Sequence, residues 1–292
     1  MLNFRHARQS DKKDVLRFCT NTFEWGDYIE QVWDVWYSDP NGYLVVAEDN
    51  EVIAGVSHAY ICPNRNGVWL EGIRVNPNFR RRSIGTELIK KMIQYGKEQG
   101  AKEAAAVVSV NNIPSQAMME KSGFVVISRW NYYSTTIVHQ RSETEPVRIA
   151  TLKDMEMIRN YLKQSQIFMA AAESYVDFWR WYHLVDLDSG ILQNLVDSKR
   201  VIVSGIDHSI IKGLMIINKY NSVFQIGYLD ACDVLTLRYL VRFVFNLAYS
   251  EETKNRYEKL QIFSPQIHFL QSCMKDLAIN EYGQFLLYKR DN

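Results

Sequence analysis

Three consecutive arginines stand where an apolar, strand-like run gives way to a helical pattern, and such a place suits the binding of an anion. Residues 68–75 are mostly apolar, and residues 84–99 carry apolar side chains at helical spacing up to Gly100. Free N–H groups at the helix start, the positive end of its dipole and the guanidinium groups together form a candidate phosphate site. A glycine in the first turn lets the backbone approach the anion closely. The residues of this candidate site are Arg80, Arg81, Arg82, Ser83, Ile84, Gly85 and Thr86.

This segment resembles the acetyl-CoA signature of the GNAT acetyltransferase superfamily, Gln/Arg-x-x-Gly-x-Gly/Ala. Arg80 takes the first position and Gly85 the last, whereas Ser83 replaces the first glycine. In the family this loop holds the pyrophosphate of coenzyme A, so the resemblance implies acetyl-CoA as co-substrate. The alternative for so short a motif is a helix N-terminus with solvated arginines.

A second match lies downstream. Residues 104–110 read as a buried strand of small and β-branched residues. Asn112 follows, eleven residues before the pair Gly123 and Phe124, which is the spacing found in GNAT proteins. The resemblance, which covers residues 1–138, implies that the fifth strand splays from the fourth and admits the pantetheine arm. The cofactor contacts that it implies here are Asn112, Ser115 and the backbone groups of Ile73 and Val75.

Glu71 is the candidate catalytic base. It stands four residues before the end of the central strand, where other GNAT enzymes carry His or Glu, and an amine must lose a proton before it can attack a thioester. Regular pairing places it on the opposite face from Arg74. The alternative is a structural glutamate paired with Arg74 or Arg80. Trp69, on the same face as Glu71, is expected to shape the acceptor pocket.

The general acid cannot be assigned from the sequence. Met119 stands where many family members carry a tyrosine that protonates the departing thiolate, and methionine has no proton to donate. Ser115, Tyr132 and Tyr133 are the candidates to replace it. The thiolate can also leave unassisted, because a thiol ionises far more readily than an alcohol.

An aromatic and acidic segment at residues 23–37 is expected to cover the acceptor side of the cleft. Trp25 and Tyr28 are candidate substrate contacts, and the nearby acids could meet a cationic amine; core packing is the alternative for the aromatic residues. Together with the strand at residues 70–75 and a GNAT-like second half, this segment also resembles the histidine N-acetyltransferase group, which suggests a free amino acid or similar small amine as acceptor.

Composition excludes several classes of protein. The chain has 292 residues, 47% of them hydrophobic, which is enough for two domains, and its net charge of +1 predicts neither nucleic-acid nor membrane binding. Four cysteines without a Cys-x-x-Cys pair, and six histidines without ligand spacing, argue against a metal site. No signal peptide and no membrane-spanning stretch is recognisable, so we expect a cytoplasmic protein.

A polar run at residues 140–146 is the expected boundary between two domains, 1–140 and 146–292. The second resembles a copy of the first. Arg148 and Asp154 repeat the spacing of Arg5 and Asp11.

The correspondence ends at residues 230–237, which have neither glycine nor an arginine cluster. We therefore expect an α+β (α/β mixed-sheet) protein of two tandem GNAT-like domains, the second degenerate, that binds one coenzyme A per chain. The expected reaction is transfer of acetyl to a primary amine by direct attack in a ternary complex. The alternatives are a protein N-terminal acetyltransferase and a non-catalytic CoA-binding sensor. The identity of the acceptor and the oligomeric state stay open.

Overall fold

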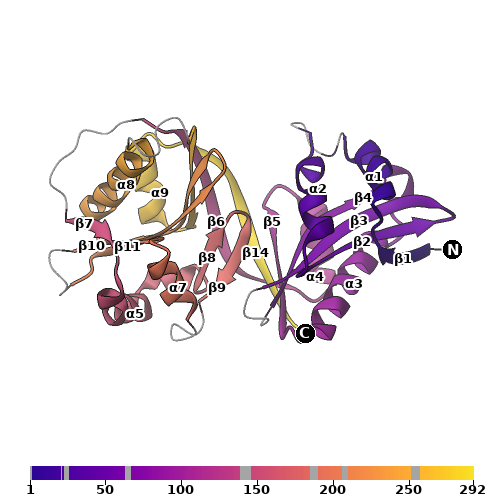
Figure 1. Ribbon diagram of the computed structural model, residues 1–292, viewed down its shortest axis with the longest axis horizontal. Coiled ribbons are helices and arrows are strands. Elements are labelled where there is room, and N and C mark those ends of the chain that lie inside the picture. The colour runs from indigo at the N-terminus through magenta and orange to yellow at the C-terminus, as the bar shows by residue number, and fades with distance from the viewer. Residues whose placement is uncertain are drawn as a thin grey trace. The chain divides into compact units, whose positions relative to one another are not determined.

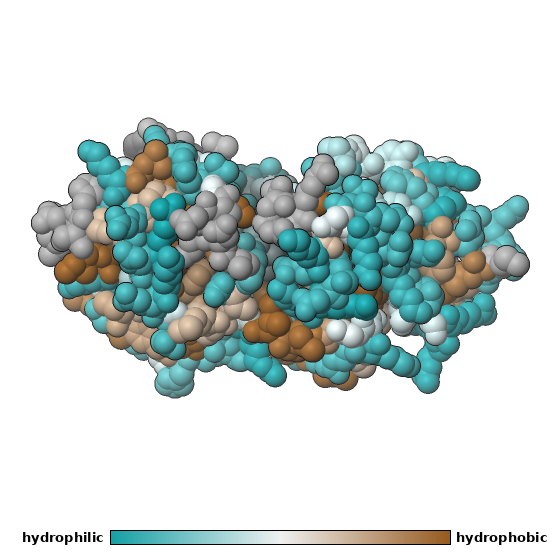
Figure 2. All heavy atoms as spheres, turned by 90° about the horizontal axis from the view of Figure 1, so that it is seen from below, coloured by the Kyte–Doolittle hydropathy of each residue, from teal (hydrophilic) through white to brown (hydrophobic). Residues whose placement is uncertain are grey.

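Two compact units make up the chain (Figure 1). The first comprises Met1–Val126 with Tyr288–Asn292, and the second Ile127–Leu287. The computed structural model describes residues 2–20, 22, 26–62, 67–138, 146–184, 190–205, 210–250 and 257–292. Within these ranges no helix is long and apolar enough to cross a membrane. Hydrophilic side chains cover most of the face seen in Figure 2, with apolar patches between them.

The strands of the first unit lie in the order β1-β2-β3-β4-β5, with the C-terminal end of β14 beside β5. They are β1 (Leu2–His6), β2 (Gly42–Asp49), β3 (Val52–Ile61), β4 (Gly67–Val75), β5 (Glu103–Ser109) and β14 (Glu281–Asp291). Neighbours are antiparallel up to β4, whereas β4 and β5 are parallel. That parallel pairing covers only residues 67–69 and 103–105. The edge of β4 beyond Trp69 therefore has no ladder partner in β5.

Helices cover both faces of these strands. The elements are η1 (Gln9–Asp11), α1 (Lys12–Cys19), α2 (Ile29–Ser38), η2 (Pro77–Phe79), α3 (Ile84–Glu98) and α4 (Ile113–Lys121). Figure 1 shows α1 and α2 on one side of the strands and α3 with α4 on the other. The α1–α2 side has an apolar core that includes Val15, Trp33 and Val56. Position 56 on β3 therefore marks the face of the sheet that these two helices cover.

A β-bulge interrupts β4 at Gly72 and Ile73, which together stand opposite the single residue Ser57 of β3. Gly72 has φ +68°, a conformation that favours glycine. The extra residue reverses the alternation of side chains beyond the bulge. Glu71 and Arg74 consequently lie on the same face. The prediction that they face opposite ways is wrong, because it assumed regular pairing.

The end of the chain completes the first unit. Arg290 Nη1 donates to the backbone oxygen of Ser122 at 2.6 Å, just after α4. Asn292 N donates to the backbone oxygen of Lys102 at 2.9 Å, just before β5. Tyr288–Asn292 is thus anchored to both elements that follow α3.

The strands of the second unit lie in the order β7-β10-β11-β12-β13-β6, and β12 and β13 are the parallel pair. They are β6 (Val125–Thr136), β7 (Val147–Ile149), β10 (Val201–Ser204), β11 (Gly213–Tyr220), β12 (Val223–Ala231) and β13 (Lys259–Pro265), and a separate hairpin pairs β8 (Ser174–Asp177) with β9 (Arg180–His183). The helices are η3 (Leu152–Asp154), α5 (Met155–Gln164), α6 (Gln166–Ala170), α7 (Ile191–Asp197), α8 (Val234–Tyr249) and α9 (His268–Asp276).

The two units begin with the same ion pair. Arg5 donates to both oxygens of Asp11 at 2.7 and 3.0 Å, and Arg148 donates to both oxygens of Asp154 at 2.7 and 2.6 Å. In each unit the acid ends a 3-10 helix and accepts from the backbone amide three residues earlier. The internal repeat expected from the spacing is therefore present in the folded chain.

A closely packed glycine recurs as well. A Cβ on Gly55 would lie 3.1 Å from Ile84 of α3, and one on Gly213 would lie 2.7 Å from Leu240 of α8. Each glycine lets the helix that follows the central strand pack closely against the sheet.

The compact units do not follow the chain boundary expected at residues 140–146. Residues 140–145 lie outside the described part of the chain, and the division falls at Val126. The strand β6 groups with the second unit because seven of its residues pair with β13. The functional extents 1–140 and 146–292 stay a prediction.

Candidate active site

The carboxylate of Glu71 is paired with the imidazole of His58, its cross-strand neighbour on β3. His58 Nδ1 lies 2.8 Å from Glu71 Oε1. When Glu71 is ionised, its carboxylate only accepts hydrogen bonds, and His58 Nδ1 is then the donor of this contact. The His58 side chain is 0% exposed and that of Glu71 is 14% exposed. Of the two, only Glu71 can meet a substrate.

A tryptophan holds the imidazole in place. Trp36 of α2 stacks on His58 with ring centroids 4.6 Å apart and an interplanar angle of 5°. Two glycines provide the space for this stack. A Cβ on Gly72 would come within 2.5 Å of the Trp36 ring, and one on Gly42 would come within 2.5 Å of His58 Nε2.

Arg74, beyond the bulge, binds Asp27 in a bidentate ion pair. Its Nε donates to Asp27 Oδ2 at 2.7 Å and its Nη2 to Oδ1 at 3.1 Å. The guanidinium also lies over the ring of Tyr28, 5.0 Å from its centroid. Burial raises the pKa of Tyr28, the Arg74 charge opposes this, and the carboxylate of Glu71 adds to it. The phenol is therefore neutral and stands among the charged groups of the site.

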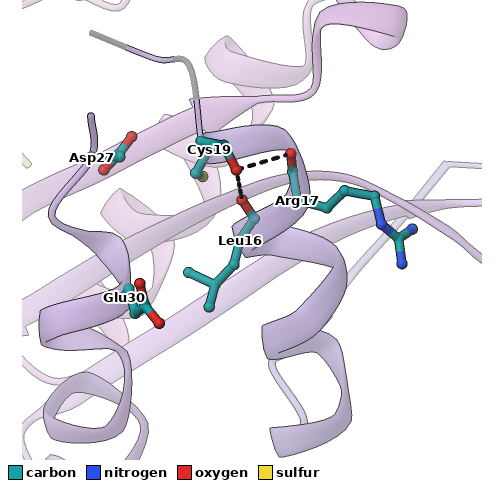
Figure 3. A pocket seen from close by; sticks show the side chains of 6 residues that line it. Leu16, Arg17, Cys19, Asp27 and Glu30 are labelled. Carbon is teal, nitrogen blue, oxygen red and sulfur yellow. Dashed lines mark hydrogen bonds between the residues drawn. The ribbon is translucent and has the colours of Figure 1, made fainter. Parts of the chain in front are cut away.

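A cleft of about 350 Å³ opens beside this ion pair, between α1 and the start of α2 (Figure 3). It is lined by Leu16, Arg17, Cys19, Thr20, Asp27 and Glu30. Figure 3 shows the two acids on one side of the cleft, and the guanidinium of Arg17 pointing away from them. Arg17 instead pairs with Asp14 at 3.1 Å. Because Asp27 is only 4% exposed and already paired with Arg74, Glu30 is the acid on that side which could meet a cationic ligand.

Cys19, in the wall of the cleft, is not a nucleophile in this environment. Burial and, to a lesser extent, the charge of Asp27 raise the pKa of its thiol to about 12, although Arg74 opposes both. A thiol attacks as the thiolate, which such a pKa disfavours. Within the described residues, no three His, Cys, Asp or Glu side chains are grouped to hold a metal ion.

The arginine loop leads into α3 through unusual backbone conformations. Arg81 and Ser83 have φ +64° and +60°. Ser83 is the N-cap of α3 but makes no side-chain cap hydrogen bond, and the first helical bond runs from Glu87 N to Ser83 O. The amides of the first turn consequently have neither an intrahelical acceptor nor a side-chain cap from Ser83. Such amides suit an anion.

The three arginines differ in their surroundings. All are exposed, but Arg82 lies 3.5 Å from Asp49 and stacks over Phe79. Arg80 and Arg81 make no ion pair within the described residues. These two are the charges that a phosphate could bind without first displacing an acid.

The glycine of this loop has a packing role that the sequence did not indicate. A Cβ on Gly85 would lie 2.6 Å from Met118 Sδ of α4. Glycine lets Met118 of α4 pack against the first turn of α3, whether or not an anion approaches.

The start of α4 brings together two of the predicted cofactor contacts. Asn112 is its N-cap and accepts from Ser115 N at 3.2 Å. The other two, Ile73 and Val75, lie on β4 beyond its last pair with β5. The backbone oxygen of Ile73 accepts from Arg74 Nη1 at 3.1 Å. Ile73 and Val75 thus lie on the part of β4 that has no partner in β5, and Asn112 and Ser115 lie at the start of the helix that follows β5.

The candidate general acids divide between the units. Tyr132 and Tyr133 belong to the second unit, where Tyr133 is buried in the apolar core and Tyr132 stacks on Phe263. Burial raises the pKa of both phenols. Ser115 belongs to the first unit, and Met119, which replaces the family tyrosine, is only 1% exposed.

The predicted acceptor contacts differ in their surroundings and exposure. Tyr28 lies with Arg74 and the acids, whereas Trp69 is only 1% exposed and packs inside the first unit. Trp25 lies outside the described residues.

Sequence reasoning missed the pairing of His58 with Glu71 and the stacking of Trp36 on His58. No spacing motif in the sequence connects these three residues. The signal was the hairpin itself. Once residues 52–61 and 67–75 are paired antiparallel, His58 stands directly opposite Glu71.

Part of the chain matches a known protein family. Residues 12–124 match the acetyltransferase (GNAT) family. Aminoglycoside N(6')-acetyltransferase type 1 of Salmonella typhimurium is 34% identical over 82 residues, which are 27% of this chain and 57% of that protein. The chain thus spans little more than half the length of that relative.

Two solved structures share the fold over nearly the whole chain. A GCN5-related N-acetyltransferase of Sphaerobacter thermophilus has a TM-score of 0.63 at 12% identity, covering 99% of this chain and 95% of that one. A tandem GNAT protein from the clavulanic acid biosynthesis pathway has a TM-score of 0.58 at 11% identity, covering 100% and 98%. The expected tandem GNAT fold is therefore confirmed.

Proposed function

Because residues 12–124 form a domain of the acetyltransferase (GNAT) family, we propose that this chain transfers acetyl from acetyl-CoA to a primary amine of a small molecule. The observation that carries the proposal is the position of Glu71. It is a partly exposed carboxylate at the bulge of the central strand, on the face that also bears the Arg74–Asp27 pair and Tyr28.

The donor fits the loop before α3. The exposed guanidinium groups of Arg80 and Arg81 and the amides of the first helical turn would bind the pyrophosphate. The pantetheine arm would follow the unpaired edge of β4, where Ile73 and Val75 supply backbone groups. A backbone N–H there would polarise the thioester carbonyl.

The acceptor amine would enter from the acidic cleft between α1 and α2. Glu71 takes its proton, directly or through a water, and the nitrogen then attacks the carbonyl carbon. The new C–N bond replaces the C–S bond, and coenzyme A leaves as a thiolate that takes up a proton. Direct attack agrees with the buried Cys19 thiol, whose raised pKa disfavours an acyl-enzyme at that residue.

An amine panel assayed for release of coenzyme A tests this function. The panel contains free amino acids, diamines, an aminoglycoside and a peptide with a free N-terminus. We expect turnover with at least one small amine, and a loss of roughly 100-fold or more in Glu71→Gln, which keeps the shape but not the base. Affinity for acetyl-CoA should stay within about twofold.

Three results would contradict the proposal. Turnover of the peptide alone would assign the acceptor to a protein N-terminus. An unchanged rate in Glu71→Gln at every pH would make Glu71 structural. Binding of acetyl-CoA without turnover of any amine would favour the alternative of a non-catalytic CoA-binding sensor.

A further inference from the structure

A fully buried histidine is unusual in a strand of small apolar residues. The neighbours of His58 on β3 include Val56 and Ala59, and its own side chain is 0% exposed. Burying an imidazole costs free energy unless its polar atoms are bonded. Its bonded partner is Glu71, at 2.8 Å. The polar contact that stabilises His58 is thus made to the one residue proposed to accept the substrate proton.

Three elements fix the plane of the imidazole. Trp36 of α2 stacks on it within 5° of parallel, and Glu71 of β4 binds its Nδ1. On β2, Gly42 leaves room for Nε2, because a Cβ there would approach to 2.5 Å. An imidazole held in this way directs a proton donor at a fixed point on the carboxylate.

We propose that His58 is a positioning residue that orients the carboxylate of Glu71 toward the acceptor amine. This inference rests on the proposed function. The Nδ1–H bond restrains Oε1, and thereby the side-chain conformation of Glu71, next to the bulge of β4. Charged and titratable groups near the pair include Tyr28, which interacts with Glu71, and the ion pair of Arg74 and Asp27 beside Tyr28. His58 itself, being 0% exposed, does not touch substrate.

Two variants distinguish a positioning role of the His58 imidazole from a role in filling space. His58→Leu fills a similar volume but has no donor, whereas the amide nitrogen of His58→Asn can occupy the place of Nδ1. We expect His58→Leu to lower kcat roughly 10- to 100-fold, as misplaced catalytic groups do, with the KM for acetyl-CoA almost unchanged. His58→Asn should recover most of that loss. His6→Leu removes an exposed histidine of the same unit that is bonded to a backbone oxygen; it is the control for loss of an imidazole and should keep its kcat.

The rate should depend on pH differently in the two variants. The rise of kcat with pH should move in His58→Leu and stay close to the wild-type position in His58→Asn, which a purely structural histidine would not produce. Equal losses in both variants, with unchanged pH profiles, would overturn the proposal. Acetyl-CoA titration of each variant reports whether it is folded. If His58→Leu does not fold, the comparison of His58→Asn with wild type decides, and a loss as large as that of Glu71→Gln refutes positioning.

One measurement needs no turnover. The ¹⁵N chemical shifts of the His58 imidazole should show the proton on Nδ1 in the wild type, and a different distribution in Glu71→Leu. If the wild type acetylates no amine, the proposed function fails while this spectrum still tests the pairing. A wild-type imidazole protonated on Nε2 alone would refute the pairing itself.

Discussion

Gly72 determines where the side chains around the candidate base point. Its φ of +68° creates the bulge that turns Glu71 and Arg74 to one face. The missing Cβ also admits the ring of Trp36, which in turn holds His58. A single residue type thus satisfies a backbone requirement and a packing requirement at the same site.

Gly72→Ala should destabilise the protein and disturb the site together. Its Cβ would lie 2.5 Å from the Trp36 ring, and overpacking of this kind costs about 1–3 kcal/mol in addition to the strain of positive φ. Gly100→Ala is the matched control, because Gly100 has φ +84° but nothing within 4 Å of an added Cβ. Urea unfolding and kcat should both be affected more strongly at position 72. Equal effects at the two positions would show that the contact with Trp36 is unimportant.

At the scale of elements, the central strands of the two units carry opposite charges at one position. Arg74 and Asp230 each directly precede the strand residue that stands opposite the closely packed glycine, Gly55 or Gly213. Arg74 binds an acid of the segment between α1 and α2. In the second unit, Asp230 instead accepts hydrogen bonds from hydroxyl groups.

Three hydroxyl groups hold the carboxylate of Asp230. Ser165 donates at 2.5 Å, Tyr228 at 2.7 Å and Tyr161 at 2.8 Å. The residue is only 2% exposed, and burial raises its pKa above the usual 3.8 although the three hydroxyl groups oppose this. Residues 231–237, which lead from this acid into α8, include no arginine, and this supports the proposal that the second unit binds no coenzyme A.

The pH dependence of stability should reveal this acid. Because its folded pKa is raised, the stability that Asp230 contributes is present below about pH 3.8 and is lost as the pH rises through the folded value. The difference in unfolding free energy, wild type minus Asp230→Asn, should therefore fall as the pH rises above about 3.8. Urea titrations at several pH values measure it.

Asp233 supplies a control of opposite sign. It caps α8 by accepting from Thr236 N at 2.7 Å, and this bond lowers its pKa below 3.8. The difference for Asp233→Asn should instead rise with pH below about 3.8, between the lowered folded pKa and the unfolded value, and stay level above it. A flat difference for Asp230→Asn would mean that its carboxyl titrates normally.

Some of these features could be predicted from the sequence, and others could not. The arginine loop, the start of α3 and the repeated Arg–Asp pair depend on local spacing, so they could be read from the residues. The bulge at Gly72, the partner of Glu71 and the contact of Gly85 with Met118 depend on which strands and helices meet. A linear pattern does not specify those meetings, and the assumption of regular pairing led to the wrong face for Arg74.

At the scale of the whole molecule, each compact unit uses chain from both halves of the sequence. Tyr288–Asn292 belongs to the first unit, and β6 belongs to the second from Ile127 onward. A fragment ending near residue 142 would remove the contacts of Arg290 and Asn292 with the first unit. Tests of donor binding therefore require the full chain.

Calorimetric titration of the full-length chain with acetyl-CoA tests the central claim most directly. The account predicts one binding site per chain, located at the loop before α3. Arg80→Gln with Arg81→Gln should weaken binding by about 1–3 kcal/mol, because each lost group makes a charge-assisted hydrogen bond to phosphate. Lys90→Gln, on the exposed side of the same helix beyond its first turn, should leave affinity unchanged. Two equivalent sites per chain, or unchanged affinity in the double variant, would contradict the account.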